Sequence, residues 1–236
     1  HLAYQPKVST LTGEVTGVEA LVRWRHPQHG DVSPSIFVAL IEEAARTSEL
    51  LDTVMEMAAR DRRRYRALSA MPDVSVNISV LDLDDEELPR RAQKLLCSAA
   101  PAEAWTFEVT ETALIERQPA IASRLAQLRT HGCSLAIDDF GTGYSSLSYL
   151  SALPIDRLKI DKSFVASSFS DANSAVIIEA VISLARSLGL HTIAEGVETE
   201  AQRRFLRQQG CEQIQGFLVG RPMPPEAVGA YLKALC

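Results

Sequence analysis

The sequence predicts an α/β domain in which parallel strands close into a barrel with helices around it. Short apolar or β-branched runs alternate with helical segments from residue 74 onward, which is the pattern of a parallel sheet. A chain of 236 residues, 46% of them hydrophobic, suits one large core better than two small ones. Two earlier strands, joined by a tight turn at Thr12 and Gly13, indicate an opening hairpin.

The individual elements follow from local signals. The predicted strands are short apolar runs bounded by turn or polar residues, at residues 2–8, 15–24, 74–77, 105–108, 135–138, 157–160, 191–195 and 212–217. Pro34 after Ser33 opens a helix, and Thr199 with Gln202 forms a capping box. The predicted helices lie at residues 33–46, 49–68, 83–99, 120–131, near 147, at 172–188, from 199 and at 224–235.

The alternative to a closed barrel is an open, doubly wound sheet. Six or so strand–helix units in one domain of this length favour closure. No GxGxxG fingerprint follows the early strands, which weakens the open-sheet alternative.

The charge balance limits the partners. The formal net charge is −6 and the pI is about 5.4, so no broad basic face is expected and neither duplex nucleic acid nor an anionic membrane is a predicted partner. The most apolar long segment, residues 175–188, carries Glu179 and Arg186 at helical spacing, as an amphipathic helix does and a membrane span does not. A phosphate-bearing substrate remains open if metal ions supply positive charge.

Cysteine usage favours a reducing compartment. Cys97, Cys133, Cys211 and Cys236 are scattered, with no CxxC spacing. Scattered cysteines in an acidic globular chain are typical of reduced, buried thiols, so we expect a cytoplasmic domain. The abrupt start within a strand suggests a domain cut from a longer protein.

Polar side chains mark the ends of successive predicted strands. In a barrel these ends meet at one mouth, where chemistry takes place; they are Asn77, Glu108, Asp138, Lys159, Glu195 and Gln215. Asp138 is followed by Asp139, and so many acids in one mouth would repel each other without a compensating cation. Oxygen ligands suit Mg²⁺ or Mn²⁺ rather than zinc.

Two simpler interpretations compete with this one. Asp138 and Asp139 would also suit a solvated turn with a helix cap, because Asp is common in turns. Lys159 at a strand end would also suit a Schiff-base lysine of an aldolase-like enzyme, although the acid cluster is denser than that chemistry needs.

Several strings of residues resemble one family. Glu19-Ala20-Leu21 within GVEALVRWRHP is similar to the signature of EAL domains, bacterial phosphodiesterases that cleave cyclic di-GMP. The strings YQP, NIS, EVTET, DDFGTGYSSL, LKIDKSF, AEGVET and QGF follow in family order and cover nearly the whole chain. The resemblance implies a modified (β/α)₈ barrel with one antiparallel opening strand, in agreement with the predicted hairpin.

The resemblance also implies roles for individual residues. Glu19, Asn77, Glu108 and Asp138 resemble the ligands of one Mg²⁺ or Mn²⁺ ion, and Asp138, Asp139 and Glu195 those of a second. Lys159 resembles the residue that holds the attacking water, and Gln215 a residue that contacts it. Arg23 and Gln5 resemble substrate ligands, Glu111 the anchor of the loop at residues 140–146, and Glu198 a supporting residue.

The implied activity is hydrolysis of cyclic di-GMP to the linear dinucleotide pGpG. The alternative is a catalytically weak or inactive cyclic di-GMP receptor, but here every ligand position is filled. The resemblance further implies regulatory domains in the parent chain and a homodimer formed near the loop at residues 140–146 and the helix after it.

Overall fold

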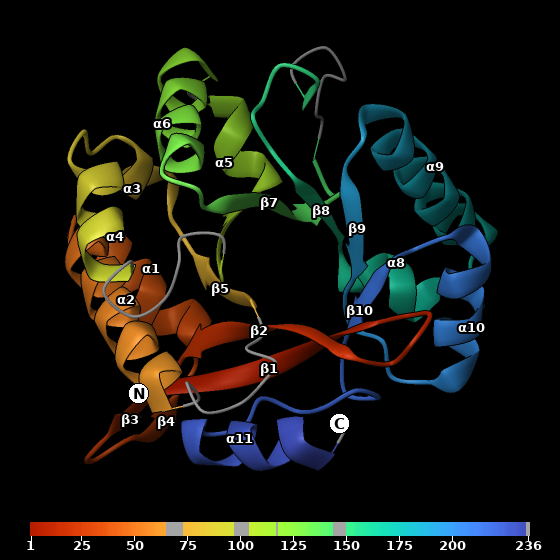
Figure 1. The fold of residues 1–236 in the computed structure, drawn as a ribbon, viewed down its shortest axis with the longest axis horizontal. Helices are drawn as coiled ribbons and strands as arrows, with labels where there is room; N and C mark the ends of the chain where they lie inside the picture. Colours follow the sequence, from red (N-terminus) through yellow and green to blue (C-terminus); the bar gives the residue numbers. More distant parts are fainter. Residues whose placement is uncertain (65–72, 97–103, 117, 144–149, 235–236) are drawn as a thin grey trace.

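The computed structural model describes residues 1–64, 73–96, 104–116, 118–143 and 150–234. Eight strands close into a barrel, which Figure 1 shows surrounded by helices. The barrel strands are β1 (Leu2–Ser9), β2 (Val15–Val22), β5 (Asp73–Asn77), β6 (Trp105–Thr110), β7 (Ser134–Phe140), β8 (Arg157–Ile160), β9 (His191–Ala194) and β10 (Gln213–Gln215). The closed barrel predicted from the alternating pattern is therefore confirmed.

One strand runs against the others. Around the barrel the order is β1-β10-β9-β8-β7-β6-β5-β2, and β1 pairs antiparallel with both β2 and β10 while the remaining neighbours are parallel. The predicted antiparallel opening strand is thus present. Because β1 is reversed, its amino-terminal half lies at the end of the barrel where the other strands have their carboxyl ends.

The helices of the described segments cover the outside of the barrel (Figure 1). They are α1 (Pro34–Glu43), α2 (Thr47–Arg64), α3 (Val80–Leu83), α4 (Leu88–Leu96), α5 (Glu111–Glu116), α6 (Gln118–Thr130), α8 (Lys162–Ser167), α9 (Ala172–Leu188), α10 (Glu200–Gln209) and α11 (Pro225–Ala234). The predicted capping box is formed, with the Thr199 hydroxyl accepting from the Gln202 N–H. The short helix predicted near residue 147 falls outside the described residues. Within the described segments, no helix combines the length and apolar character needed to cross a membrane.

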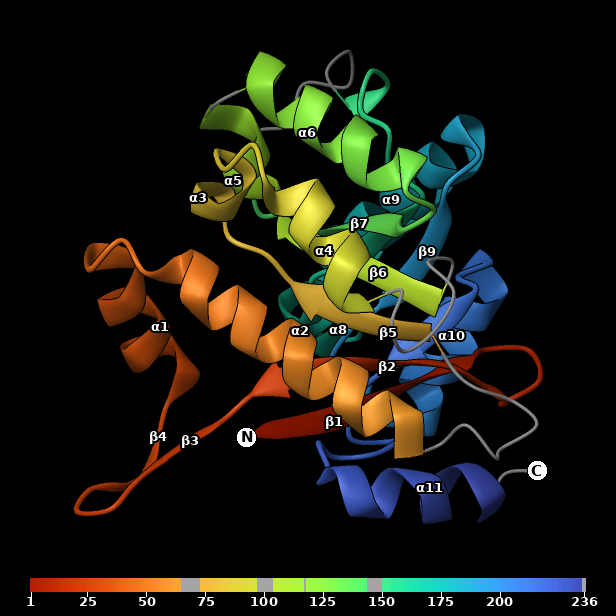
Figure 2. The same ribbon diagram turned by 60° about the vertical axis from the view of Figure 1, so that its left-hand side comes forward.

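Two predicted boundaries are wrong. The predicted strand 15–24 ends at Val22, and β3 (Trp24–His26) pairs instead with β4 (Gly30–Val32) in a separate two-stranded sheet, which Figure 2 shows standing away from the barrel. The predicted helix 83–99 is interrupted, because α3 ends at Leu83 and α4 begins at Leu88. In both cases suitable residues continue in sequence, but the chain leaves the barrel after Val22 and turns between Leu83 and Leu88.

Strand β6 shows how the sequence places polar groups inside. All its residues but the last are buried. Trp105 and Phe107 belong to the apolar core shared with the helices, while the alternate residues Thr106 and Glu108 bond to side chains of β5 and β8. Because successive strand residues face opposite sides, Glu108 points into the barrel.

Candidate metal centre and active site

The polar side chains predicted at the strand ends do converge at one mouth of the barrel. Asn77 and Gln215 end β5 and β10, Lys159 lies one residue before the end of β8, and Glu195 follows β9 directly. Glu108 and Asp138 each lie two residues before the end of their strands. The remaining members come from the opening hairpin, with Gln5 on β1 and Glu19 on β2.

Lys159 lies at the centre of this cluster. Its Nζ is 2.6 Å from Glu108 Oε2, 2.7 Å from Glu195 Oε1, 3.0 Å from Asp138 Oδ1 and 3.7 Å from Glu19 Oε2, and its side chain is fully buried. An ammonium group in the interior is stabilised only where charged partners offset its lost hydration. Lys159 is therefore the cation that the crowded carboxylates of this mouth require.

Two groups of carboxylates share Asp138. Oxygen atoms of Glu19, Glu108 and Asp138 lie within 4.8 Å of one another, and so do those of Asp138, Asp139 and Glu195. The two groups contain the carboxylates that the family resemblance implies for a first and a second metal ion. Asp139 adopts a left-handed backbone with φ of 53°, which an aspartate tolerates better than most residues and which lets two adjacent carboxylates serve one centre.

The pKa values of the carboxylates in this cluster are shifted in opposite directions. Burial raises the pKa of Asp138 to about 6 and that of Glu195 to about 8, although Lys159 opposes both shifts. Burial would also raise the pKa of Glu108, but the charges of Lys159 and Lys7 prevail and lower it to about 2. The carboxylates of this mouth outnumber its two buried lysines, so divalent cations would complete the charge balance.

Glu19 is held at both oxygens by amide groups. Asn77 Nδ2 donates to Glu19 Oε1 at 2.7 Å, and Gln215 Nε2 donates to Glu19 Oε2 at 2.6 Å and to Gln5 Oε1 at 3.2 Å. Because both partners of Gln215 Nε2 are acceptors, its Oε1 faces away from them; this buried oxygen has no hydrogen-bond partner among the described residues. A buried acceptor without a donor fits a bound water, and an all-oxygen donor set fits Mg²⁺ or Mn²⁺.

A hollow of about 490 Å³ opens above the carboxylates. It is lined by Asp138 and Glu195 and by each residue assigned to the substrate or to support: Gln5, Arg23, Gln215 and Glu198. Arg23 follows β2 directly, and its Nη1 donates to the Val22 carbonyl at 2.8 Å. The hollow thus joins a guanidinium to the acidic cluster, which suits a phosphate substrate.

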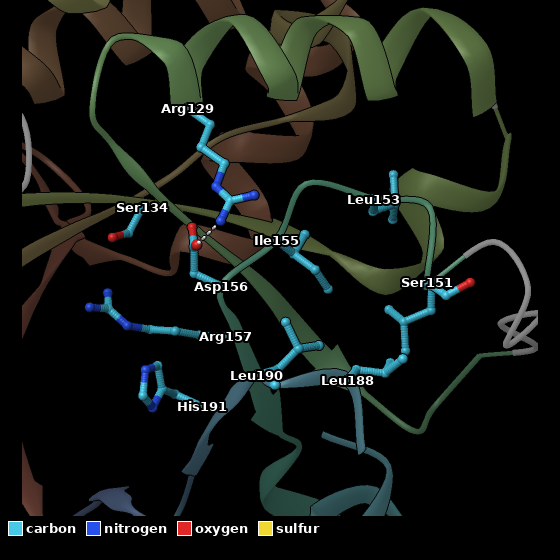
Figure 3. A pocket seen from close by; sticks show the side chains of 12 residues that line it. Arg129, Ser134, Ser151, Leu153, Ile155, Asp156, Arg157, Leu188, Leu190 and His191 are labelled. Carbon is cyan, nitrogen blue, oxygen red and sulfur yellow. Dashed lines mark ion pairs between the residues drawn. The ribbon is translucent and has the colours of Figure 1, made fainter. Parts of the chain in front are cut away.

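A second hollow, of about 440 Å³, lies at the opposite end of the barrel (Figure 3). Its charged groups already have protein partners: Arg129 Nη2 lies 3.0 Å from Asp156, and Arg157 Nη1 lies 2.7 Å from Asp73. Asp156 also accepts from the Leu135 N–H at 2.9 Å. Among the described residues, the lining of this hollow has ion pairs and a single carboxylate, Asp156, whereas the described carboxylate groups lie at the mouth.

Glu111 begins α5, beside the loop that follows β7. Its Oε2 accepts from the N–H groups of Gly141 at 2.7 Å and Gly143 at 3.3 Å. A Cβ at position 143 would lie 2.9 Å from Glu111 Oε1, so the glycine permits this close approach. The described part of the loop is therefore hydrogen-bonded to Glu111, while residues 144–149 lie outside the described chain.

Sequence reasoning missed two charged residues of the mouth. Lys7 lies on β1 with its ammonium beside Glu108, but a single lysine in an opening strand gives no signal of burial. Asp161 caps α8 and is hydrogen-bonded to Asp139 through its side chain. The string LKIDKSF contained Asp161, and its place two residues after Lys159 was the available signal.

Comparison with known proteins gives a consistent set of matches. The EAL domain profile matches residues 1–222. The chain is 42% identical over 228 residues to the bifunctional diguanylate cyclase/cyclic di-GMP phosphodiesterase MucR of Pseudomonas aeruginosa, covering 95% of this chain and 33% of that protein. It is 41% identical over 235 residues to the cyclic di-GMP phosphodiesterase NbdA of the same organism, covering 99% of this chain and 30% of that protein.

A solved structure of the PaMucR phosphodiesterase in complex with c-di-GMP superposes with a TM-score of 0.92 at 41% identity, covering 97% of this chain and 93% of that one. The chain spans about a third of the length of the two curated relatives. Resemblance in sequence and resemblance in structure therefore point to the same group of proteins.

Proposed function

This chain belongs to the EAL domain family, and from that premise we propose that it is a metal-dependent phosphodiesterase that hydrolyses cyclic di-GMP to pGpG. The observation that carries the proposal is the pair of carboxylate groups that share Asp138 beneath a hollow containing Arg23. Relatives that the chain matches over nearly its whole length are cyclic di-GMP phosphodiesterases, and their activity supports the choice of substrate.

Two Mg²⁺ or Mn²⁺ ions are the proposed cofactors. Glu19, Asn77, Glu108 and Asp138 would hold one, and Asp138, Asp139 and Glu195 the other. Asn77 suits this role because its Nδ2 is engaged by Glu19, which leaves its Oδ1 for a cation. Such a metal pair lowers the pKa of water and neutralises charge at phosphorus.

The side chains of the protein bind the substrate, position the water and hold the loop. Arg23 and Gln5 bind the substrate, with the guanidinium able to hold two phosphate oxygens at once. Lys159 holds the attacking water and offsets the negative charge that develops at phosphorus. Gln215 Oε1, for which the described residues offer no donor, accepts a hydrogen bond from that water. Glu195, which contacts Lys159, takes part in catalysis together with that lysine. Glu111 fixes the loop after β7, and Glu198 supports the rim of the hollow.

One assay separates this proposal from its alternatives. The purified domain is incubated with cyclic di-GMP and Mg²⁺ or Mn²⁺, with and without chelator, and the products are separated by chromatography. We expect pGpG only with metal, and we expect Asp31→Asn, at an exposed position on β4, to behave as wild type. Binding of cyclic di-GMP without pGpG would move the chain to the receptor class. Trapping of a carbonyl substrate by borohydride would instead favour the aldolase-like chemistry.

The wider setting is also a proposal. We infer that the domain works in the cytoplasm as part of a longer signalling protein with regulatory domains, in keeping with the fraction of its relatives that it covers. A homodimer near the loop at residues 140–146 remains a prediction, because part of that loop and the helix after it lie outside the described residues.

A further inference from the structure

A second buried lysine lies beneath the site. Lys7, in the middle of β1, is only 1% exposed, and its partners across the strands are Gly17 and Gln215. Burying an ammonium group costs several kcal/mol unless hydrogen-bonded charges offset it. An apolar residue would fill this interior position at lower cost, so the charge itself calls for an explanation.

The contacts of Lys7 lead to one carboxylate. Its Nζ donates to Glu108 Oε1 at 3.2 Å and, in a shorter bond, to the Ser75 hydroxyl. Ser75 is fully buried and its side chain is also hydrogen-bonded to Glu108. The other oxygen, Glu108 Oε2, bonds to Lys159. Each oxygen of Glu108 thus accepts from a different lysine, Oε1 from Lys7 and Oε2 from Lys159, and Ser75 bonds to both Lys7 and Glu108.

The neighbouring strand leaves room for this arrangement. A Cβ at Gly17 would lie 3.1 Å from Lys7 Cε, which is tighter than ordinary van der Waals contact. The lysine stem therefore passes over a position without a side chain and reaches the Glu108 carboxylate. The opening hairpin supplies both the lysine and the space it occupies.

We propose that Lys7 is a positioning residue that fixes the rotation of the Glu108 carboxylate and so prepares the first metal site. The inference rests on the proposed function. Groups that orient metal ligands change metal affinity about 10–100-fold when they are removed. A purely electrostatic role predicts the opposite, because removing a nearby cation would make divalent binding tighter.

The test measures Mn²⁺ binding directly, by electron paramagnetic resonance titration at a temperature where each variant is folded. Lys7→Met keeps the stem and removes the ammonium; we expect Mn²⁺ affinity to fall about 10-fold or more. Excess Mn²⁺ should recover much of the turnover in this variant. Arg157→Met is the matched control, because it removes an interior ion pair at the opposite end of the barrel; we expect its Mn²⁺ affinity to equal that of wild type.

Ser75→Ala provides a second variant with almost no change in volume, and we expect it to weaken Mn²⁺ binding several-fold. Should Lys7→Met fail to fold, Mn²⁺ binding by Ser75→Ala tests the positioning role. Unchanged or tighter Mn²⁺ binding in either folded variant, or an equal loss in Arg157→Met, overturns the positioning role. A wild type that binds no Mn²⁺ and makes no pGpG refutes the proposed function instead, so the two failures are distinct.

Discussion

The replacement Asp138→Asn separates the metal role of this residue from its role in folding. Asp138 Oδ1 lies 3.0 Å from Lys159 Nζ and accepts from the Asp139 N–H at 2.9 Å. An asparagine can keep both contacts with its Oδ1. Its Nδ2 would then replace the second carboxylate oxygen. The fold should therefore accept the change, while the shared negative ligand is lost.

The expected stability change follows from the pKa. Burial, with the charges of Glu108 and Glu19, raises the pKa of Asp138 from 3.8 to about 6. A carboxyl group whose pKa is raised on folding destabilises the native state once the pH exceeds the unfolded value, and the loss is complete above the folded value. The wild-type protein without metal should thus lose about 3 kcal/mol between pH 4 and pH 6. The asparagine variant has no carboxyl group at this position, so its stability does not fall in this way.

The assay is a set of paired melts and turnover measurements. In chelator at pH 8 the variant should melt up to roughly 6 to 12 °C above wild type, and the difference should vanish near pH 4. Excess Mg²⁺ should stabilise wild type far more than the variant. Turnover should fall roughly a thousandfold, the equivalent of about 4 kcal/mol of lost charge stabilisation. A variant that melts well below wild type in chelator would make Asp138 a structural residue, and near-normal turnover would remove it from the metal site.

Three further outcomes are expected. Arg23→Ala should weaken cyclic di-GMP binding at least tenfold with Mn²⁺ affinity unchanged, because Arg23 lines the hollow and is absent from both carboxylate groups; equal substrate affinity in a binding titration would contradict its role. Glu111→Gln should keep Mn²⁺ affinity yet lower turnover about 10- to 100-fold, since the loop amides of Gly141 and Gly143 lose a charged acceptor worth about 1.5–3 kcal/mol; turnover equal to wild type would show that this anchor is unimportant. Gly216→Ala should destabilise the fold by several kcal/mol in chemical denaturation, because its Cβ would lie 2.1 Å from the Val197 carbonyl oxygen; a soluble variant with unchanged stability would refute that steric argument.

The barrel itself was predictable because its strands carry their signals locally. The segments that contain Asn77, Asp138 and Lys159 are short, carry apolar or β-branched residues and are bounded by turns, and each becomes a strand at nearly the predicted residues. Since parallel strands meet at their carboxyl ends, the convergence of their polar ends followed from topology alone. The reversed β1 was indicated by the tight turn that joins it to β2.

Features that depend on long-range packing were not predictable. Nothing near Lys7 in the sequence reveals that its ammonium meets Glu108, because the contact joins residues on strands β1 and β6. An aspartate tolerates the left-handed backbone of Asp139 but does not require it, so the residue type alone did not predict that conformation. The separate sheet at Trp24–His26 was missed since its residues continue the strand pattern of β2 without a break.

The lysine at the centre of the mouth has a consequence for how the protein is made. A zinc finger has no stable fold until its metal arrives. Here Lys159 already gives Glu108, Asp138 and Glu195 a cationic partner, so the polypeptide can fold and accumulate in a metal-poor cell. Under the proposed function, the abundance of the protein would be set by synthesis and turnover of the chain, and its activity by the supply of divalent ions. Metal starvation would then leave folded protein that regains activity when the ions return, without new synthesis.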